Sequence, residues 1–122
     1  MSDERLVVAR FLIVPPPGHN EKEAEMPKYV ILVNWTDQGA KSAKDTVSRF
    51  RAARQLVESK GGTFDTFFWT LGPFDMVAVS DVPDDETGTA INLALASTGN
   101  VRTLTMRAFT EDEMPGIIAK MG

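Results

Sequence analysis

The chain has 122 residues, of which 43% are apolar and 25% are charged, the composition of a single globular domain. Its 17 acidic and 13 basic side chains give a net charge of −4, which excludes the overall positive charge of a typical nucleic-acid-binding protein. Cysteine is absent, which excludes disulfides, thiolate nucleophiles and iron–sulfur clusters, and a single histidine excludes a multi-histidine metal site. No apolar run is long enough to span a membrane and no secretory signal is visible, so we expect a cytoplasmic protein.

The first 25 residues differ in pattern from the rest of the sequence. Leu6–Val14 is apolar enough for a strand, three prolines and a glycine end it, and Glu21–Glu25 is charged and without pattern. Codons for Lys22-Glu23-Ala24 can spell a strong bacterial ribosome-binding sequence just upstream of the Met26 codon. We therefore hypothesise that residues 1–25 are a misassigned start and that 26–122 is the folded domain. The alternative is a genuine edge strand and linker, which an intact mass including the first residue would establish.

The part that follows this extension opens with a predicted strand and helix. The strand over Lys28–Trp35 is apolar on both faces, which is typical of a central strand covered on both sides. Thr36–Gly39 is predicted as a turn, and a helix follows from Asp45 or Thr46 to about Lys60, where two glycines end it. The apolar stripe of this helix consists of Val47, Phe50, Ala53, Leu56 and Val57.

The remaining sequence predicts three more strands and two more helices. The strands are expected over Thr63–Leu71, Phe74–Val82 and Val101–Phe109. Three acidic residues, Asp84-Asp85-Glu86, favour the start of a helix that runs to about Ser97. Thr110-Glu111-Asp112-Glu113 is a capping box for a short last helix, which Pro115 and Gly116 weaken.

This β-α-β-β-α-β order predicts an α+β fold, a ferredoxin-like sandwich with an antiparallel four-stranded sheet and a short C-terminal helix. The strands over Lys28–Trp35 and Phe74–Val82 are expected in the centre of the sheet and parallel to each other. Helices can cover only one face of such a sheet, and the other face also carries apolar side chains. We therefore expect an obligate homo-oligomer, most simply a dimer packed through the open sheet face.

Five separate segments, in the right order, resemble the GYD domain family. They are Met26-Pro27-Lys28-Tyr29-Val30, Asn34-Trp35-Thr36-Asp37-Gln38-Gly39, Gly72-Pro73-Phe74-Asp75, Asn100-Val101-Arg102-Thr103 and Arg107-Ala108-Phe109-Thr110-Glu111-Asp112-Glu113. The resemblance covers Met26–Met121 and implies a fold of the dimeric α/β-barrel group. The Gly-Tyr-Asp signature stands here as Gly72, Phe74 and Asp75 with Pro73 inserted, so a phenolic proton donor is missing at this place. The typical start of the family coincides with Met26.

A looser resemblance links the chain to the ligand-binding module of leucine-responsive-type regulators. That module has the same topology and a Gly-x-aromatic-Asp turn before its third strand, where the turn lies at an inter-subunit effector site. The matching residues here are Gly72, Phe74 and Asp75. This resemblance implies a ligand site between subunits.

Asp75 is the first candidate site residue, and two interpretations of it stay open. It is either a turn acid that accepts backbone N–H bonds or a carboxylate at the rim of an inter-subunit cavity. Gly72 is expected to adopt a positive φ angle. Asn34 is either a satisfied buried amide or a group that faces a ligand, and Trp35 is expected to serve packing more than stacking on a ligand.

The last predicted strand carries polar side chains that alternate with apolar ones. If Thr103, Thr105 and Arg107 face the open side of the sheet, they line a partner-covered cavity, and an arginine there favours a carboxylate or phosphate. The alternative is an edge strand kept soluble by polar residues. Together, the candidate ligand-binding residues are Asn34, Trp35, Gly72, Phe74, Asp75, Arg102, Thr103 and Arg107.

Two functions remain open on the sequence. The first is an oligomeric small-ligand-binding or structural module with its site between subunits, binding a small polar or amphipathic ligand and neither nucleic acid nor membrane. The second is a cofactor-independent enzyme, an isomerase or monooxygenase acting on a small hydrophobic substrate with Asp75 and an arginine. The sequence from Met26 onward has neither histidine nor cysteine, and we expect no cofactor and no metal site, so the binding module is favoured.

Overall fold

The structure, a computed structural model, describes residues 26–122. The strand predicted over Leu6–Val14 and the hypothesis of a start at Met26 concern residues outside this described part. The described elements are β1 (Lys28–Trp35), α2 (Asp37–Lys41), η1 (Ala43–Asp45), α3 (Thr46–Ser59), β2 (Thr63–Trp69), β3 (Met76–Asp81), α4 (Asp85–Ser97), β4 (Val101–Ala108), η2 (Glu111–Glu113) and α5 (Met114–Ala119).

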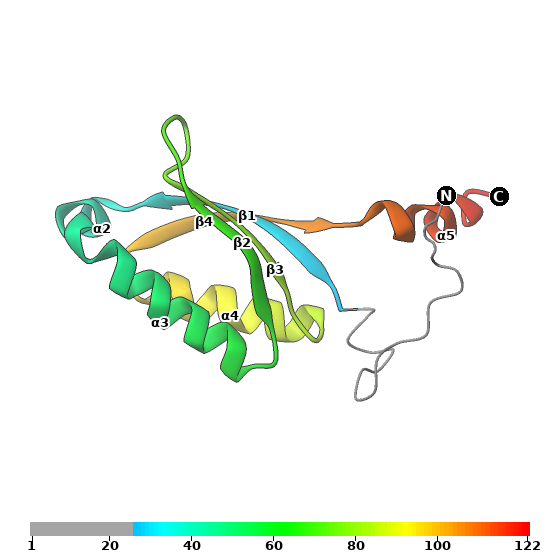
Figure 1. Cartoon of the computed structure of the whole chain (residues 1–122), viewed down its shortest axis with the longest axis horizontal. Helices are drawn as coiled ribbons and strands as arrows, with labels where there is room; N and C mark the ends of the chain where they lie inside the picture. The colour runs from blue at the N-terminus through cyan, green and yellow to red at the C-terminus, as the bar shows by residue number, and fades with distance from the viewer. Residues whose placement is uncertain (1–25) are drawn as a thin grey trace.

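The four strands form one sheet in the order β2-β3-β1-β4, and α3 and α4 lie together on one side of it (Figure 1). Each neighbouring pair of strands is antiparallel. This arrangement confirms the ferredoxin-like α+β fold and the central position of β1 and β3, the two strands that are apolar on both faces. The apolar pattern and the order of the elements therefore predicted which two strands lie in the centre of the sheet.

The expectation that β1 and β3 run parallel is wrong, because Lys28 pairs with Asp81 and Val33 pairs with Met76. The connection through α3 brings the chain back across the sheet, so that β2 runs parallel to β1. The hairpin after β2 then reverses the chain, so β3 enters the space between them in the opposite direction. A tight turn joins only antiparallel strands, and this constraint decides the direction.

The predicted turn over Thr36–Gly39 is also wrong, because a short helix, α2, begins there. The Thr36 hydroxyl accepts a hydrogen bond from the Gly39 N–H at 3.1 Å and caps this helix. Gly39 is buried against β4, and a Cβ atom added to it would lie 2.0 Å from the Asn100 carbonyl oxygen. A glycine is therefore needed where α2 touches the start of β4.

The core lies between the sheet and the two long helices in two buried clusters. One cluster joins β1 and β3 through Ile31, Val33, Met76 and Ala78. The other joins α3, the end of β3 and α4 through Val57, Val82 and Ile91. Within residues 26–122, these seven are the buried hydrophobic side chains, a small core for a segment of this length.

The opposite face of the sheet carries apolar side chains that no described helix covers. We call this surface the open face, and it consists of Val30, Leu32, Phe68, Val77, Val79, Leu104 and Met106. The strand register makes the patch continuous, because Leu32 lies beside both Val77 and Leu104. Phe68, Leu104 and Met106 are 61%, 54% and 44% exposed. Exposed apolar area of this kind marks an interaction surface.

The chain leaves the sheet after β4 through η2 and α5, which project away from α3 and α4 (Figure 1). The predicted capping box is present, since the Glu113 carboxylate accepts from the Thr110 N–H at 2.9 Å. Residues 111–122 are all exposed, including Ile118 at 55% and Met121 at 82%. At the other side of the sheet, β2 carries a bulge between Phe64 and Thr66.

Candidate functional site

The structure divides the eight predicted site residues between the two ends of the sheet. Seven of them lie at the end where β1 finishes and β4 begins, because Trp35 pairs with Val101 there and Asp75 follows the β2–β3 hairpin. Arg107 lies on β4 five residues beyond Arg102, which is about 17 Å along an extended strand. The structure therefore brings seven of the predicted site residues to one end of the sheet and places Arg107 at the other end.

Asp75 ties the hairpin to the end of β1. Its carboxylate accepts a hydrogen bond from the Trp35 N–H at 2.9 Å, and its own N–H donates to the Val33 carbonyl at 2.9 Å. Its carbonyl accepts from the Thr70 N–H at 2.9 Å. These contacts match the interpretation of Asp75 as a turn acid, and its role at the rim of an inter-subunit cavity stays a prediction.

The hairpin itself is built from Gly72 and Phe74. Gly72 has a φ angle of +135°, which confirms the expectation that this position needs a glycine. The Thr70 hydroxyl donates to the Phe74 carbonyl at 2.6 Å and closes the turn, while the Phe74 ring is partly buried. Neither side chain offers a proton for chemistry here.

The candidate residues on β1 and β4 point to both faces of the sheet. Asn34 and Arg102 are register partners on the open face, whereas Trp35 and Thr103 point toward the helices. The proposal of a polar lining on the open face required Thr103, Thr105 and Arg107 to point there. They point to the helix side instead, where the Thr105 hydroxyl accepts from the Asn92 amide at 3.2 Å.

Arg107 belongs to a separate polar group with Tyr29 and Asp85. Its guanidinium stacks over the Phe109 ring at 4.5 Å and lies 3.7 Å from the Asp85 carboxylate. The Tyr29 hydroxyl donates a hydrogen bond to the same carboxylate. Partial burial, together with this hydrogen bond and the negative charge of Asp85, raises the pKa of Tyr29 to about 12. The group fastens the start of α4 to β1 and β4.

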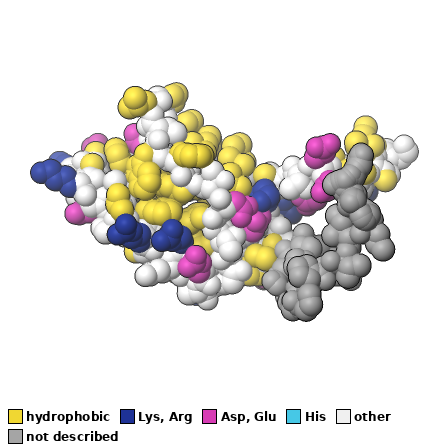
Figure 2. Space-filling view, in the orientation of Figure 1, with side chains coloured by type: hydrophobic (Ala, Val, Ile, Leu, Met, Phe, Trp, Pro, Cys, Tyr) yellow, Lys and Arg dark blue, Asp and Glu magenta, His cyan; other side chains and the backbone are white. Residues whose placement is uncertain are grey.

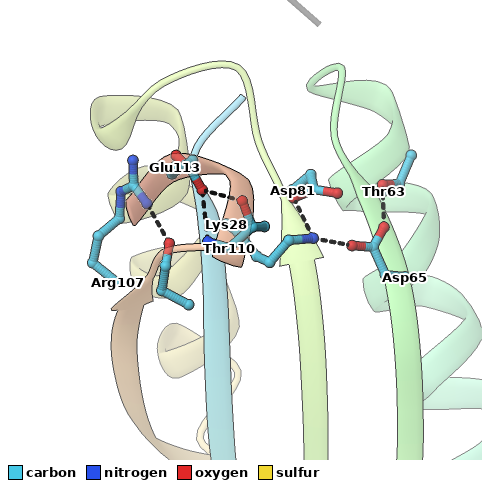
Figure 3. A network of polar contacts seen from close by, with 8 residues as sticks. Lys28, Thr63, Asp65, Asp81, Arg107, Thr110 and Glu113 are labelled. Carbon is cyan, nitrogen blue, oxygen red and sulfur yellow. Dashed lines mark hydrogen bonds and ion pairs between the residues drawn. The ribbon is translucent and has the colours of Figure 1, made fainter. Parts of the chain in front are cut away.

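A second polar network joins β1, β2 and β3 at the same end of the sheet (Figure 3). The Lys28 ammonium lies 2.5 Å from the Asp65 carboxylate and 2.9 Å from the Asp81 carboxylate. Partial burial is the largest single influence on the Asp65 carboxylate and by itself would raise its pKa, but the hydrogen bonds to Lys28, Asp81 and Thr63 and the positive charge of Lys28 together lower that pKa. Burial and the neighbouring Asp65 raise the pKa of Asp81. Lys28 thus holds two carboxylates together at the rim of the open face.

A partly open cavity of about 270 Å³ lies on the helix side, between α3, α4 and the sheet. Trp35 and Thr103 line it, together with side chains that the sequence reasoning assigned only to a core stripe, such as Phe50 and Ala53. The sequence feature that could have indicated this cavity is the alanine content of α3 and α4, since Ala53 and Ala94 leave space between the two helices. Figure 2 shows hydrophobic side chains gathered between α3 and the sheet, with Lys and Arg side chains along α3.

The described part of the chain offers neither a metal site nor a membrane-spanning helix. Residues 26–122 contain no group of three or more His, Cys, Asp or Glu side chains placed to hold a metal ion. Among the same residues, no helix has the length and apolar character needed to cross a membrane.

Comparison with known proteins gives a family and a close sequence relative. The family model of the GYD domain matches residues 29–118. A protein of Thermus thermophilus named "Glutamine synthetase and cystathionine beta-lyase binding protein" is 33% identical over 84 residues, which are 68% of this chain and 88% of the relative.

Solved structures of transcriptional regulators share the fold. The feast or famine regulatory protein of M. tuberculosis, complexed with L-methionine, has a TM-score of 0.56 at 13% identity over 87% of this chain and 67% of its own. A regulator of Neisseria meningitidis in complex with L-Met has a TM-score of 0.55 at 16% identity over 88% and 66%. The chain thus spans about two thirds of these regulators, and identities this low show similarity of fold alone.

Proposed function

Because the chain belongs to the GYD domain family, we propose that it is a binding module that assembles with a second copy of itself through the open face of its sheet. The observation that carries this proposal is the continuous apolar surface on that face, with Phe68, Leu104 and Met106 about half exposed. A protein–protein interface has an apolar centre and a polar rim. The open face has this pattern, with aliphatic side chains in the middle and the polar residues Lys28, Asp65, Asp81, Asn34 and Arg102 at its ends.

A second copy is the occupant that the composition of this face favours. The patch is apolar and continuous over all four strands, which suits face-to-face packing of two sheets. A two-fold axis uses the same patch on both subunits, so its apolar centre meets an identical centre. The small core within one chain gains most from such packing, because a shared interior adds buried apolar area.

Assembly would place the predicted site residues of the open face near a partner subunit. Asn34 and Arg102 lie side by side in register at the end of this face, next to the hairpin that contains Gly72 and Asp75. We propose that a small polar ligand binds there between subunits, with Arg102 attracting its anionic group.

The relative from Thermus thermophilus is named for binding two enzymes, and this name supports a binding role over a catalytic one. We propose accordingly that the assembled module contacts another protein. The alternative, a cofactor-independent enzyme, needs a proton-transfer group, and the best candidate, Asp75, already accepts the Trp35 N–H at 2.9 Å.

The assembly is tested by placing a charge in the open face. Leu104→Asp changes a side chain that is 54% exposed in the monomer, so the monomer should still fold. The matched control is Leu93→Asp on α4, where the leucine is 67% exposed and lies away from the sheet. We expect sedimentation velocity to show an oligomer for the parent and for Leu93→Asp, and a monomer for Leu104→Asp. A parent chain that sediments as a monomer at about 100 μM, where a micromolar complex is well formed, would refute the proposal.

A further inference from the structure

We infer that the cavity between α3, α4 and the sheet is a binding site for a small hydrophobic carboxylate. This site lies within one subunit, on the side of the sheet opposite the open face, so it is independent of self-association. Its volume is about 270 Å³. An apolar cavity of about 150 Å³ is already enough to bind benzene, so this one accommodates a ring with a short side chain.

The walls of the cavity are apolar and partly aromatic. The sheet contributes Trp35, Phe67 and Met76, and α3 contributes Phe50. The Phe50 and Phe67 rings lie 4.2 Å apart between centroids, and a chain of ring contacts continues to Trp69. Packed rings of this kind hold their positions, so the wall is preformed for another flat apolar group.

The space exists because the two helices pack closely only at one end. There, Val57 of α3 and Ile91 of α4 meet over Val82. Toward the other end, the facing side chains are Ala52 and Ala53 on α3 and Ala94 on α4, and these are too small to fill the gap. Substituting larger apolar residues for these alanines would close the cavity.

Arg49 lies on the wall of the cavity at the end where α3 begins. Its guanidinium donates to the Ser42 hydroxyl at 2.7 Å, to the Ser42 carbonyl at 3.1 Å and to the Gly39 carbonyl at 3.2 Å. A guanidinium has five N–H donors, so the described residues leave two of them for another acceptor. Among residues 26–122, no carboxylate forms an ion pair with Arg49.

These two features together define the ligand class. The apolar walls reject a strongly hydrated anion such as phosphate, and the fixed guanidinium, which has no carboxylate partner among residues 26–122, favours one carboxylate. Thr103 and Asn100 line the cavity and add polar atoms beside its apolar walls. A single aromatic ring or branched chain bearing one carboxylate satisfies both features.

The probe for this site is 3-phenylpropionate, compared with its neutral amide, 3-phenylpropionamide. We expect saturable binding of the carboxylate by calorimetry and by chemical-shift changes at Trp35, Phe67 and Ala94. We expect at least tenfold weaker binding of the amide. Arg49→Gln removes the charge together with the hydrogen bonds to Ser42 and Gly39. It should weaken binding of the carboxylate at least tenfold and leave binding of the amide unchanged, and unchanged amide binding would show that the loss of these hydrogen bonds does not disturb the cavity.

Ala94→Leu fills the cavity and should abolish binding while raising the melting temperature. The matched control, Ala96→Leu, makes the same change on α4 at a residue that does not line the cavity, and it should bind like the parent. If Ala94→Leu does not fold, Ala53→Leu makes the same test from the α3 wall. No saturable binding by the parent at millimolar probe, or equal binding by Ala94→Leu and the parent, would overturn the inference.

Discussion

Tyr29 is the single tyrosine of the chain, and its hydroxyl donates to the Asp85 carboxylate on α4. The pKa of Tyr29 is about 12, whereas a free tyrosine has a pKa of about 10. Because this pKa is raised on folding, the stabilisation that protonated Tyr29 contributes to the folded state is complete below about pH 10 and is lost as the pH rises through about 12. The contribution of this contact to the free energy of unfolding should therefore be lost in alkali as Tyr29 ionises.

The titration can be measured directly, because only one tyrosinate absorbance arises. We expect the folded parent to titrate near pH 12, and Asp85→Asn to shift the midpoint toward 10 because the carboxylate is gone. Glu86→Gln is the control, since Glu86 is also exposed in the first turn of α4 and is not among the groups that perturb Tyr29. A midpoint near 10 in the folded parent would contradict the contact.

Asp75 shows which part of a residue's structural role can be predicted from the sequence and which part cannot. The turn predicted an acid that accepts a backbone N–H, and the structure supplies that N–H from Trp35. The identity of the donor was not predictable, because it lies 40 positions away and depends on which strands pair. The predicted orientation of Thr103 and Arg107 is wrong for a related reason. Alternation along a strand determines which residues share a face of the sheet, but not which face the helices cover.

At the level of elements, α2 is the helix that the sequence pattern did not predict. A helix of five residues has too little apolar periodicity to be detected, and it is held by tertiary contacts. Arg49 reaches back to the Gly39 and Ser42 carbonyls, and the Thr36 N–H donates to the Asn100 carbonyl at 3.0 Å. The longer strands and helices were predictable because each presents a complete apolar face.

Gly39 tests this tertiary origin. Gly39→Ala would place a Cβ atom 2.0 Å from the Asn100 carbonyl oxygen, so α2 and β4 must move apart. We expect a loss of about 1–3 kcal/mol in the free energy of unfolding, measured by urea denaturation. Gly116→Ala is the matched control in α5, where a Cβ atom meets nothing within 4 Å, and it should leave stability unchanged or raise it by up to about 1 kcal/mol. Equal losses in both variants would contradict the contact between α2 and β4.

At the scale of the whole molecule, stability should depend on protein concentration. If two copies share the open face, association stabilises the folded chain by mass action, and the melting temperature rises with concentration. We expect this rise for the parent and not for Leu104→Asp, measured by calorimetry between about 5 and 500 μM, a range that spans a micromolar dissociation constant. A melting temperature independent of concentration in the parent would mean that one copy is stable alone.

The bulge between Phe64 and Thr66 has a consequence for how copies can add to one another. A regular edge strand offers a row of free N–H and C=O groups on which further strands stack into fibrils. The bulge interrupts that row on β2. On the opposite edge, β4 carries charged side chains, including Arg102 and Arg107, which disfavour pairing with another strand. If two copies associate through the open face as we propose, a two-fold complex closes on itself, and we then expect the exposed apolar sheet not to polymerise into amyloid.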